Sequence, residues 1–201
     1  MDKESLQELI HELGERKGLI DFYLKEIASL SRDEGVVIRI VDFDDTLFSR
    51  DEQLEKESSL RENRGWAGID VIVNSMWISQ FIDRYYRGQD FPRDIFNLMN
   101  PETDLIITAW LRELQYMKTE AVWLLDFPTT VVDEWKDKVL EVLRYIVFEF
   151  GVIPSEVIIY EDRPEYFIEY RELLEWLLWT KIIIMKVEMD GNRGYKKIEE
   201  V

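Results

Sequence analysis

Residues 36–48 read Val-Val-Ile-Arg-Ile-Val-Asp-Phe-Asp-Asp-Thr-Leu-Phe. The first six residues are mostly β-branched and apolar, which predicts a largely buried β-strand. Three carboxylates follow within four positions, at Asp42, Asp44 and Asp45. Two like charges roughly 4 Å apart repel by about 4 kcal/mol at an effective dielectric constant of about 20. Since apolar residues flank the cluster, a bound divalent cation explains it better than full solvation; an acidic turn with Asp45 capping a helix is the alternative.

A second apolar run, residues 157–160, also ends in acids, Glu161 and Asp162, followed by Arg163. Parallel strands end at the same edge of a sheet, so the two acidic segments are expected to meet in one crevice. Magnesium, which prefers oxygen ligands beside substrate phosphates, fits such a site best. The alternative is that Asp162 caps the next helix while Arg163 pairs with Glu161.

Strand-like and helical patterns alternate along most of the chain. This alternation predicts βαβ units and therefore an α/β fold, a three-layer doubly wound parallel sheet with its active site at the carboxyl ends of the strands. The further predicted strands are 105–108, 121–125 and 182–187, and the main predicted helices are 134–150 and 164–179.

Three segments depart from this alternation. Residues 1–34 have helical spacing, broken near two glycines, and predict an N-terminal extension of two helices or one kinked helix that packs on the domain or mediates homo-oligomer formation. Within the expected catalytic domain, 35–190, the segment 49–100 is too long for a plain crossover and predicts a small helical cap. Residues 191–201 predict a C-terminal tail or an edge strand.

Composition narrows the class of protein. The chain has 201 residues, 46% of them apolar, which excludes a disordered protein, and it has no cysteine, which excludes disulfides and thiolate chemistry. The absence of a long apolar run and of a targeting segment predicts a cytoplasmic protein with no membrane partner. A net charge of −17 disfavours nucleic acid and leaves a phosphorylated small molecule as the expected partner.

The acidic strand end at residues 42–46 is similar to a known motif. Asp42-x-Asp44-x-Thr46 after a hydrophobic strand resembles motif one of the haloacid dehalogenase (HAD) superfamily, and Thr108, at the end of the strand 105–108, resembles motif two. The resemblance implies that Asp42 attacks phosphorus and forms an aspartyl-phosphate. It also implies that Asp44 protonates the leaving oxygen and then activates water, and that Thr108 binds phosphoryl oxygens.

Motifs three and four of that superfamily have counterparts too. Lys136 is the best match to the motif-three lysine, with Lys138 second, and the pair at 161–162 resembles motif four. The resemblance spans residues 36 to about 187 and implies a HAD-like Rossmannoid fold. It also implies the following magnesium ligands: Asp42, the main-chain carbonyl of Asp44, Asp162 and Glu161, with Asp162 preferred over Glu161 as the direct ligand.

Two shorter stretches, 160–163 and 130–136, look like the HAD domains called Swiss Army Knife RNA repair-like. The chain departs from that branch in having Ala109 and Trp110 where a Gly-Arg pair is common, and Tyr166 where a histidine is common. The branch implies processing of nucleic-acid ends, which the net charge disfavours.

Together these features predict a hydrolase, a magnesium-dependent phosphatase that acts on phosphomonoesters of a small metabolite or nucleotide. A nucleic-acid end phosphatase and an inactive HAD-like binding or assembly module are the alternatives. Arg84 and Arg87, next to tyrosines in the predicted cap, are candidate substrate-binding residues, or they lie on an ordinary helix face with their charges paired to acids. Thr46 and Ala109 are the other candidates for substrate binding, although Thr46 could equally cap a helix.

Overall fold

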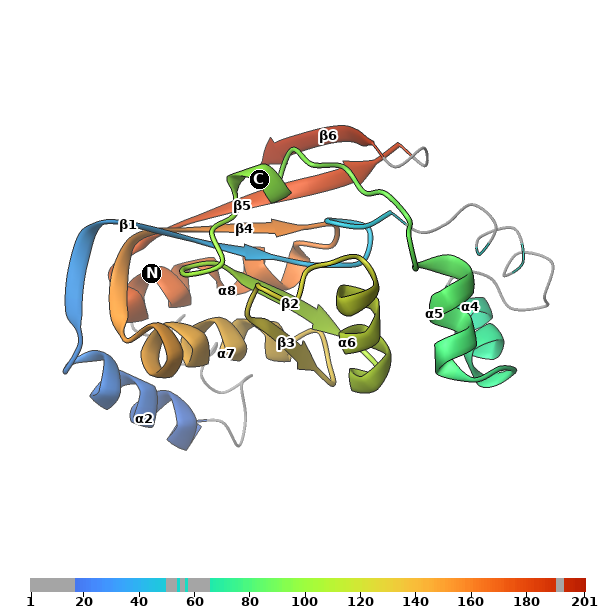
Figure 1. Ribbon diagram of the computed structural model, residues 1–201. Helices are drawn as coiled ribbons and strands as arrows, with labels where there is room; N and C mark the ends of the chain where they lie inside the picture. The colour runs from blue at the N-terminus through green and yellow to red at the C-terminus, as the bar shows by residue number, and fades with distance from the viewer. Residues whose placement is uncertain (1–16, 50–53, 55–56, 58–65, 191–193) are drawn as a thin grey trace.

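The computed structural model describes residues 17–49, 54, 57, 66–190 and 194–201. They form an α/β structure built on a six-stranded sheet in the order β3-β2-β1-β4-β5-β6 (Figure 1). The first five strands are parallel and β6 is antiparallel to β5, so the prediction of an α/β fold with a mostly parallel sheet is confirmed. The strands are β1 (Ser31–Val41), β2 (Leu105–Ala109), β3 (Thr129–Val132), β4 (Val152–Glu161), β5 (Lys181–Met189) and β6 (Tyr195–Glu200).

Two apolar clusters cover the two faces of the sheet. Side chains alternate between them, as the period of a strand requires: Leu105 and Ile107 belong to one cluster and Ile106 to the other. Cluster one also contains residues of α2 (Lys17–Ile27), α7 (Asp137–Arg144), the π-helix Tyr145–Phe150 and α8 (Glu165–Leu178). Cluster two contains residues of α4 (Trp66–Asn74), α5 (Ile78–Tyr85) and α6 (Arg112–Ala121), and Phe96 of the 3₁₀ helix Phe96–Leu98 packs against it.

The helical pattern predicted over 134–150 forms two consecutive elements. Helix α7 continues without a break into the π-helix, which ends at Gly151. Gly151 has φ 73°, a left-handed conformation that glycine adopts at little cost and that ends a helix. The chain then enters β4 directly, at Val152.

The register of the central strands brings distant residues to one edge. Val41 pairs with Tyr160 of β4 on one side and with Ile106 of β2 on the other. The Asp42 amide then donates to the carbonyl of Tyr160 at 3.0 Å. Asp42 and Glu161, each directly after these paired residues, therefore lie next to one another at the carboxyl ends of their strands.

The prediction of a strand at 121–125 is wrong. These residues form the end of α6 and the turn after it, where Trp123 has φ 64° and the amide of Leu124 donates to the Thr119 carbonyl at 3.0 Å. Val122 and Leu124 are buried while Trp123 is exposed, so a helix end produces the same alternation as a strand. The third strand of the chain is β3, four residues further on.

The segments outside the alternating pattern are only partly described. Residues 1–16 of the predicted N-terminal extension lie outside the described residues, and β1 already begins at Ser31, inside the range expected to be helical. Within the predicted cap, helices α4 and α5 lie together beyond the carboxyl ends of β1, β2 and β4 (Figure 1). Among the helices described, none combines the length and apolar character needed to cross a bilayer.

Candidate active site

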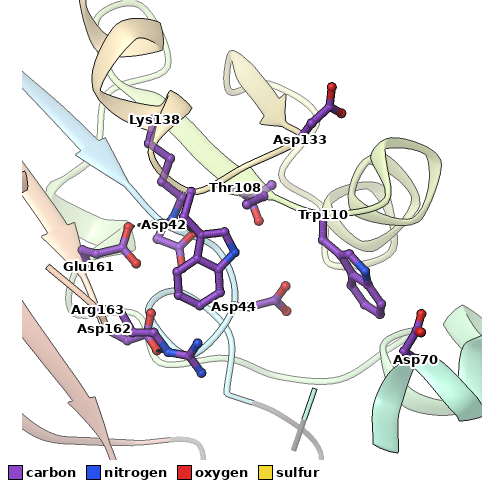
Figure 2. Close-up of a pocket in the computed structure, with 12 residues that line it drawn as sticks. Asp42, Asp44, Asp70, Thr108, Trp110, Asp133, Lys138, Glu161, Asp162 and Arg163 are labelled. Carbon is purple, nitrogen blue, oxygen red and sulfur yellow. Dashed lines mark hydrogen bonds and ion pairs between the residues drawn. The ribbon is translucent and has the colours of Figure 1, made fainter. Parts of the chain in front are cut away.

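A cavity of about 470 Å³ opens at the carboxyl ends of β1, β2, β3 and β4 (Figure 2). Its walls come from these strand ends, from the turn before α7 and from α4. Two cations, Lys138 and Arg163, also line it. The acidic residues of the wall are Asp42, Asp44, Asp70, Asp133, Glu161 and Asp162.

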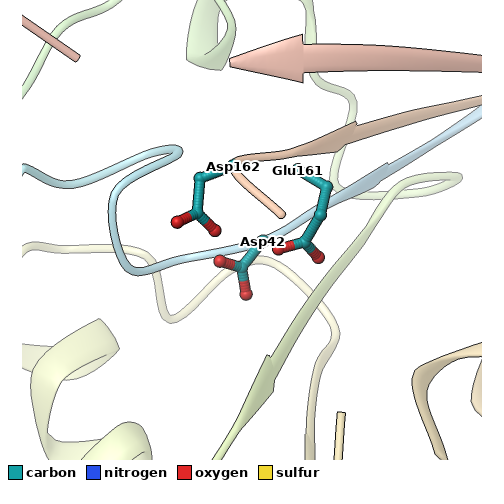
Figure 3. Close-up of side chains that lie close together, drawn as sticks. All are labelled: Asp42, Glu161 and Asp162. Atoms are coloured by element: carbon teal, nitrogen blue, oxygen red, sulfur yellow. The ribbon is translucent and has the colours of Figure 1, made fainter. Parts of the chain in front are cut away.

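Three of these acids converge (Figure 3). Asp42 follows β1, Glu161 ends β4 and Asp162 follows it, and one carboxylate oxygen from each lies within 4.8 Å of the others. Asp42 and Glu161 are 5% and 3% exposed, so most of their hydration is lost. The predicted meeting of two acidic segments that lie far apart in the sequence is therefore present in the structure.

Lys138 connects the two strand ends. Its ammonium donates to Asp42 Oδ1 and to Glu161 Oε2, both at 2.7 Å, and its side chain is almost fully buried. The residue lies in the first turn of α7, which places it over the ends of β1 and β4. Lys136, the first choice from the sequence, is half exposed, pairs with Glu134 at 2.6 Å and does not line the cavity. Lys138, the second choice, is the lysine that contacts the acids of both strands.

The electrostatics of the cluster are dominated by burial. Burial raises the pKa of Asp42 from 3.8 to about 7, against the lowering effect of Lys138 and with a further increase from Asp162. Burial also raises the pKa of Glu161 and of Asp162. Burial alone would lower the pKa of Lys138, but Asp42 and Glu161 raise it above its ordinary value, so the lysine stays charged.

A divalent cation fits this donor set. Three carboxylates face one buried ammonium, and the other lining cation, Arg163, is 3.5 Å from Asp162 but 40% exposed. The excess of buried negative charge is what a bound cation would neutralise. All three ligands are hard oxygen donors, as magnesium prefers, and two oxygens on opposite sides of Mg²⁺ lie about 4 Å apart. The carboxylates are thus already near the spacing of a shared ion.

Asp44 lies outside that trio and is held by helix α6. Lys118 Nζ donates to its two oxygens at 2.9 and 2.8 Å, and Gln115 Nε2 donates to Oδ2 at 3.0 Å. Gln115 also donates to the Ala109 carbonyl at 2.8 Å, so α6 fixes both the acid and the end of β2. Lys118 and Gln115 were not predicted from the sequence, because their i, i+3 spacing on a helix after Thr108 also occurs on ordinary helix surfaces.

Two of the four candidate substrate-binding residues lie away from the cavity. Arg84 pairs with Glu57, and Arg87 donates to Asp83 at 2.6 Å; neither lines the acidic cavity, and their role in substrate binding stays a prediction. Their charges are satisfied within the cap, on α5 and its neighbours. This arrangement matches the alternative of a paired helix face.

The other predicted residues divide between the cavity and the core. Thr108 and Ala109, at the end of β2, line the cavity. Thr46 is fully buried behind it, and its Oγ1 has no hydrogen-bond partner among the described residues. Thr46 therefore does not contact the space that a substrate would occupy in this conformation.

The cavity has aromatic walls that the sequence did not single out for a substrate. The Arg163 guanidinium lies 4.4 Å from the centroid of the Trp135 ring, a cation–π distance. Trp110 follows β2 with φ 96°, a conformation rare for a bulky residue, and its amide donates to the Val132 carbonyl at 3.1 Å. Figure 2 shows Trp110 beside Asp70, on the side of Asp44 away from Asp42 and Glu161.

In comparisons with protein-family models, with curated proteins and with solved structures, the chain matches none.

Proposed function

We propose that this protein is a magnesium-dependent phosphomonoester hydrolase that forms an aspartyl-phosphate on Asp42. The main support is the convergence of Asp42, Glu161 and Asp162 within 4.8 Å, with Lys138 bound to the first two. The same cavity contains Thr108, so a metal site, a nucleophile and phosphate-binding donors share one space of about 470 Å³. The order of these residues along the chain is that of the four HAD motifs, with Lys138 as the third.

The residues divide the chemistry between them. A carboxylate oxygen of Asp42 attacks phosphorus while the bond from phosphorus to the ester oxygen breaks, and water later displaces Asp42 to release phosphate. Asp42, Glu161 and Asp162 would hold magnesium, which when bound would supply positive charge that offsets the phosphoryl oxygens. Lys138 orients Asp42 through the 2.7 Å hydrogen bond, and the Thr108 hydroxyl is available to donate to a phosphoryl oxygen.

Asp44 is the proposed proton donor to the leaving oxygen and the later base for water. Lys118 and Gln115 hold its carboxylate at the cavity wall, so its position is set before a substrate binds. To protonate the leaving group, Asp44 must take up a proton and loosen its contact with Lys118. The role of Lys118 in this proposal is to position Asp44.

One observation favours a second function, the binding of phosphorylated ligands without turnover. Both oxygens of Asp44 accept hydrogen bonds from the buried ammonium of Lys118, a pairing that also suits a purely structural acid. A rate assay separates the two functions.

The proposal is tested with a generic aryl phosphate, comparing wild type, Asp42→Asn and Asp44→Asn with and without magnesium. Wild type is expected to hydrolyse the ester only with the metal, and Asp42→Asn to lose activity by at least about a thousandfold because it removes the nucleophile. Asp44→Asn is expected to lose about a hundredfold or more, the usual size of a general-acid contribution. Equal background rates for wild type and Asp42→Asn would support binding without turnover instead.

A further inference from the structure

The charge of the cavity wall limits what can accompany the phosphoryl group. Beyond the three converging carboxylates, Asp70 of α4 and Asp133 after β3 also line the space, and Asp133 is exposed at its rim. The only lining cations among the described residues are Lys138, which Asp42 and Glu161 already bind, and Arg163. A second phosphate on the ligand would meet acids here rather than a basic clamp.

The same wall offers planar surfaces. Trp135 lies in the turn between β3 and α7 and is half buried, with the Arg163 guanidinium stacked 4.4 Å from its ring centroid. Arg163 is joined in turn to Asp162 at 3.5 Å, so this stack begins beside the proposed metal ligands. Indole rings and guanidinium planes both bind planar rings by stacking. Trp110 adds a second indole to the lining.

We propose that the site selects monophosphate esters whose leaving group contains a planar ring and carries no further negative charge, and that Trp135 with Arg163 forms the platform for the ring. The phosphoryl group lies at Asp42 and Lys138, while Asp70 and Asp133 exclude ligands with a second phosphate. Nucleoside monophosphates and simple aryl or benzyl phosphates share this chemistry; polyphosphates and nucleic-acid ends do not. The inference rests on the proposed function, since it names the substrate class of the same site.

The ring preference is measured with two esters of similar size, benzyl phosphate and cyclohexylmethyl phosphate, which differ in the planarity of the ring. Wild type is expected to favour the benzyl ester by about tenfold in kcat/KM, the size of one stacking contact. Trp135→Leu keeps an apolar side chain but has no planar ring. It is expected to bring the kcat/KM values of the two esters within about twofold of each other. Arg163→Lys keeps the charge beside Asp162 but not the plane, and is expected to reduce the preference too.

The charge preference is measured with a nucleoside 5′-monophosphate and with the same nucleoside phosphorylated at both the 3′ and 5′ positions. Wild type is expected to have a higher kcat/KM for the monophosphate than for the bisphosphate. Asp133→Asn is expected to reduce the ratio of these two kcat/KM values severalfold. Asp126→Asn, which removes an exposed acid that does not line the cavity, is the matched control and is expected to leave the ratio unchanged. A preference for the bisphosphate in wild type would overturn this part of the inference and would favour nucleic-acid ends.

Binding without turnover separates this inference from the proposed function. In Asp42→Asn, calorimetry is expected to show tighter binding of benzyl phosphate than of cyclohexylmethyl phosphate, with the difference lost in Asp42→Asn/Trp135→Leu. That result would support the ring platform even if wild type hydrolyses nothing. If both esters are hydrolysed with equal kcat/KM, or are bound equally tightly, the proposed ring platform is wrong. The hydrolase proposal is tested separately by the aryl phosphate assay.

Discussion

Lys138 is the side chain on which the geometry of the site depends most. It is the only lysine that lines the described cavity, and it binds acids from two different strands, Asp42 and Glu161, at 2.7 Å each. Without it, the buried carboxylates of Asp42 and Glu161 would each lose the ion pair that Lys138 makes with them. Its neighbour Lys136, two residues away, has a similar sequence context but is exposed and pairs with the exposed Glu134.

The contrast between these lysines gives a matched pair of variants. Lys138→Met is expected to lower the aryl-phosphatase rate on the order of a hundredfold, and the free energy of unfolding by about 3–5 kcal/mol, because it leaves buried charges unpaired. Lys136→Met is expected to change stability by less than about 1 kcal/mol, as exposed ion pairs do. Rates and urea denaturation in parallel measure both. Equal effects of the two changes would place the functional lysine elsewhere.

The raised pKa of Asp42 predicts an unusual dependence of the free energy of unfolding on pH. Because burial raises its pKa from 3.8 to about 7, the folded protein keeps a proton that the unfolded chain loses between these values. The contribution of Asp42 to the free energy of unfolding therefore falls as pH rises from about 4 to about 7. In chelator at pH 7.5, Asp42→Asn is expected to be more stable than wild type by roughly 1–3 kcal/mol.

Denaturation of both proteins at pH 4.5 and 7.5 isolates this residue from the other acids. The difference in the free energy of unfolding between Asp42→Asn and wild type should be smaller at the lower pH, where wild-type Asp42 is protonated. A difference that is constant with pH would contradict the assigned pKa.

At the residue scale, the acids of the site were predictable from the sequence, whereas the lysine that binds them was not. Asp42, Glu161 and Asp162 follow apolar runs that end strands, and parallel strand ends meet by geometry. Lys136 and Lys138 both lie near the start of α7, and only the helical phase directs Lys138 inward. A small error in the predicted helix start is enough to exchange them.

At the scale of elements, helix α6 fixes the position of Asp44. Lys118 and Gln115, one turn apart on this helix, both donate to that carboxylate, and both side chains are buried. Lys118 also lies 5.0 Å from the centroid of the Tyr86 ring, so its stem and charge are enclosed by the cap side of the molecule.

This arrangement predicts strong coupling between Lys118 and Asp44. Lys118→Met is expected to cost about 3–5 kcal/mol, because the carboxylate loses its cation in a buried setting. The double variant Lys118→Met/Asp44→Asn should be about 1–3 kcal/mol more stable than the sum of the two single effects predicts. Urea denaturation of wild type, the two single variants and the double variant measures this coupling energy. The exposed pair Lys181–Glu156, at 3.2 Å, serves as the control cycle and should be nearly additive.

Elements were predictable where burial and local pattern agree. The apolar runs within β1, β2, β4 and β5 are buried or half-buried on both faces, which produces continuous apolar segments. The prediction for 121–125 failed because the end of a helix buries Val122 and Leu124 but not the residue between them. Strand β3 was missed because it is only four residues long and two of these are threonine.

At the scale of the whole molecule, the net charge of −17 and the acidic cavity act together. Such a field attracts divalent cations and repels polyanions, in line with a small monophosphate substrate and a metal cofactor. The topology then turns two distant sequence segments into one site, since β1 and β4 are neighbours in the sheet although more than a hundred residues separate their acidic ends.

The proposed chemistry depends above all on whether Asp42, Glu161 and Asp162 share one cation. Calorimetric titration of the metal-free protein with Mg²⁺ or Mn²⁺ is expected to show one saturable site per chain that raises the melting temperature, and that weakens at least about tenfold in Asp162→Asn. Asp126→Asn, with an acid removed elsewhere on the surface, should bind like wild type. Wild type that binds no cation saturably, or Asp162→Asn that binds as tightly as wild type, would contradict the shared metal site.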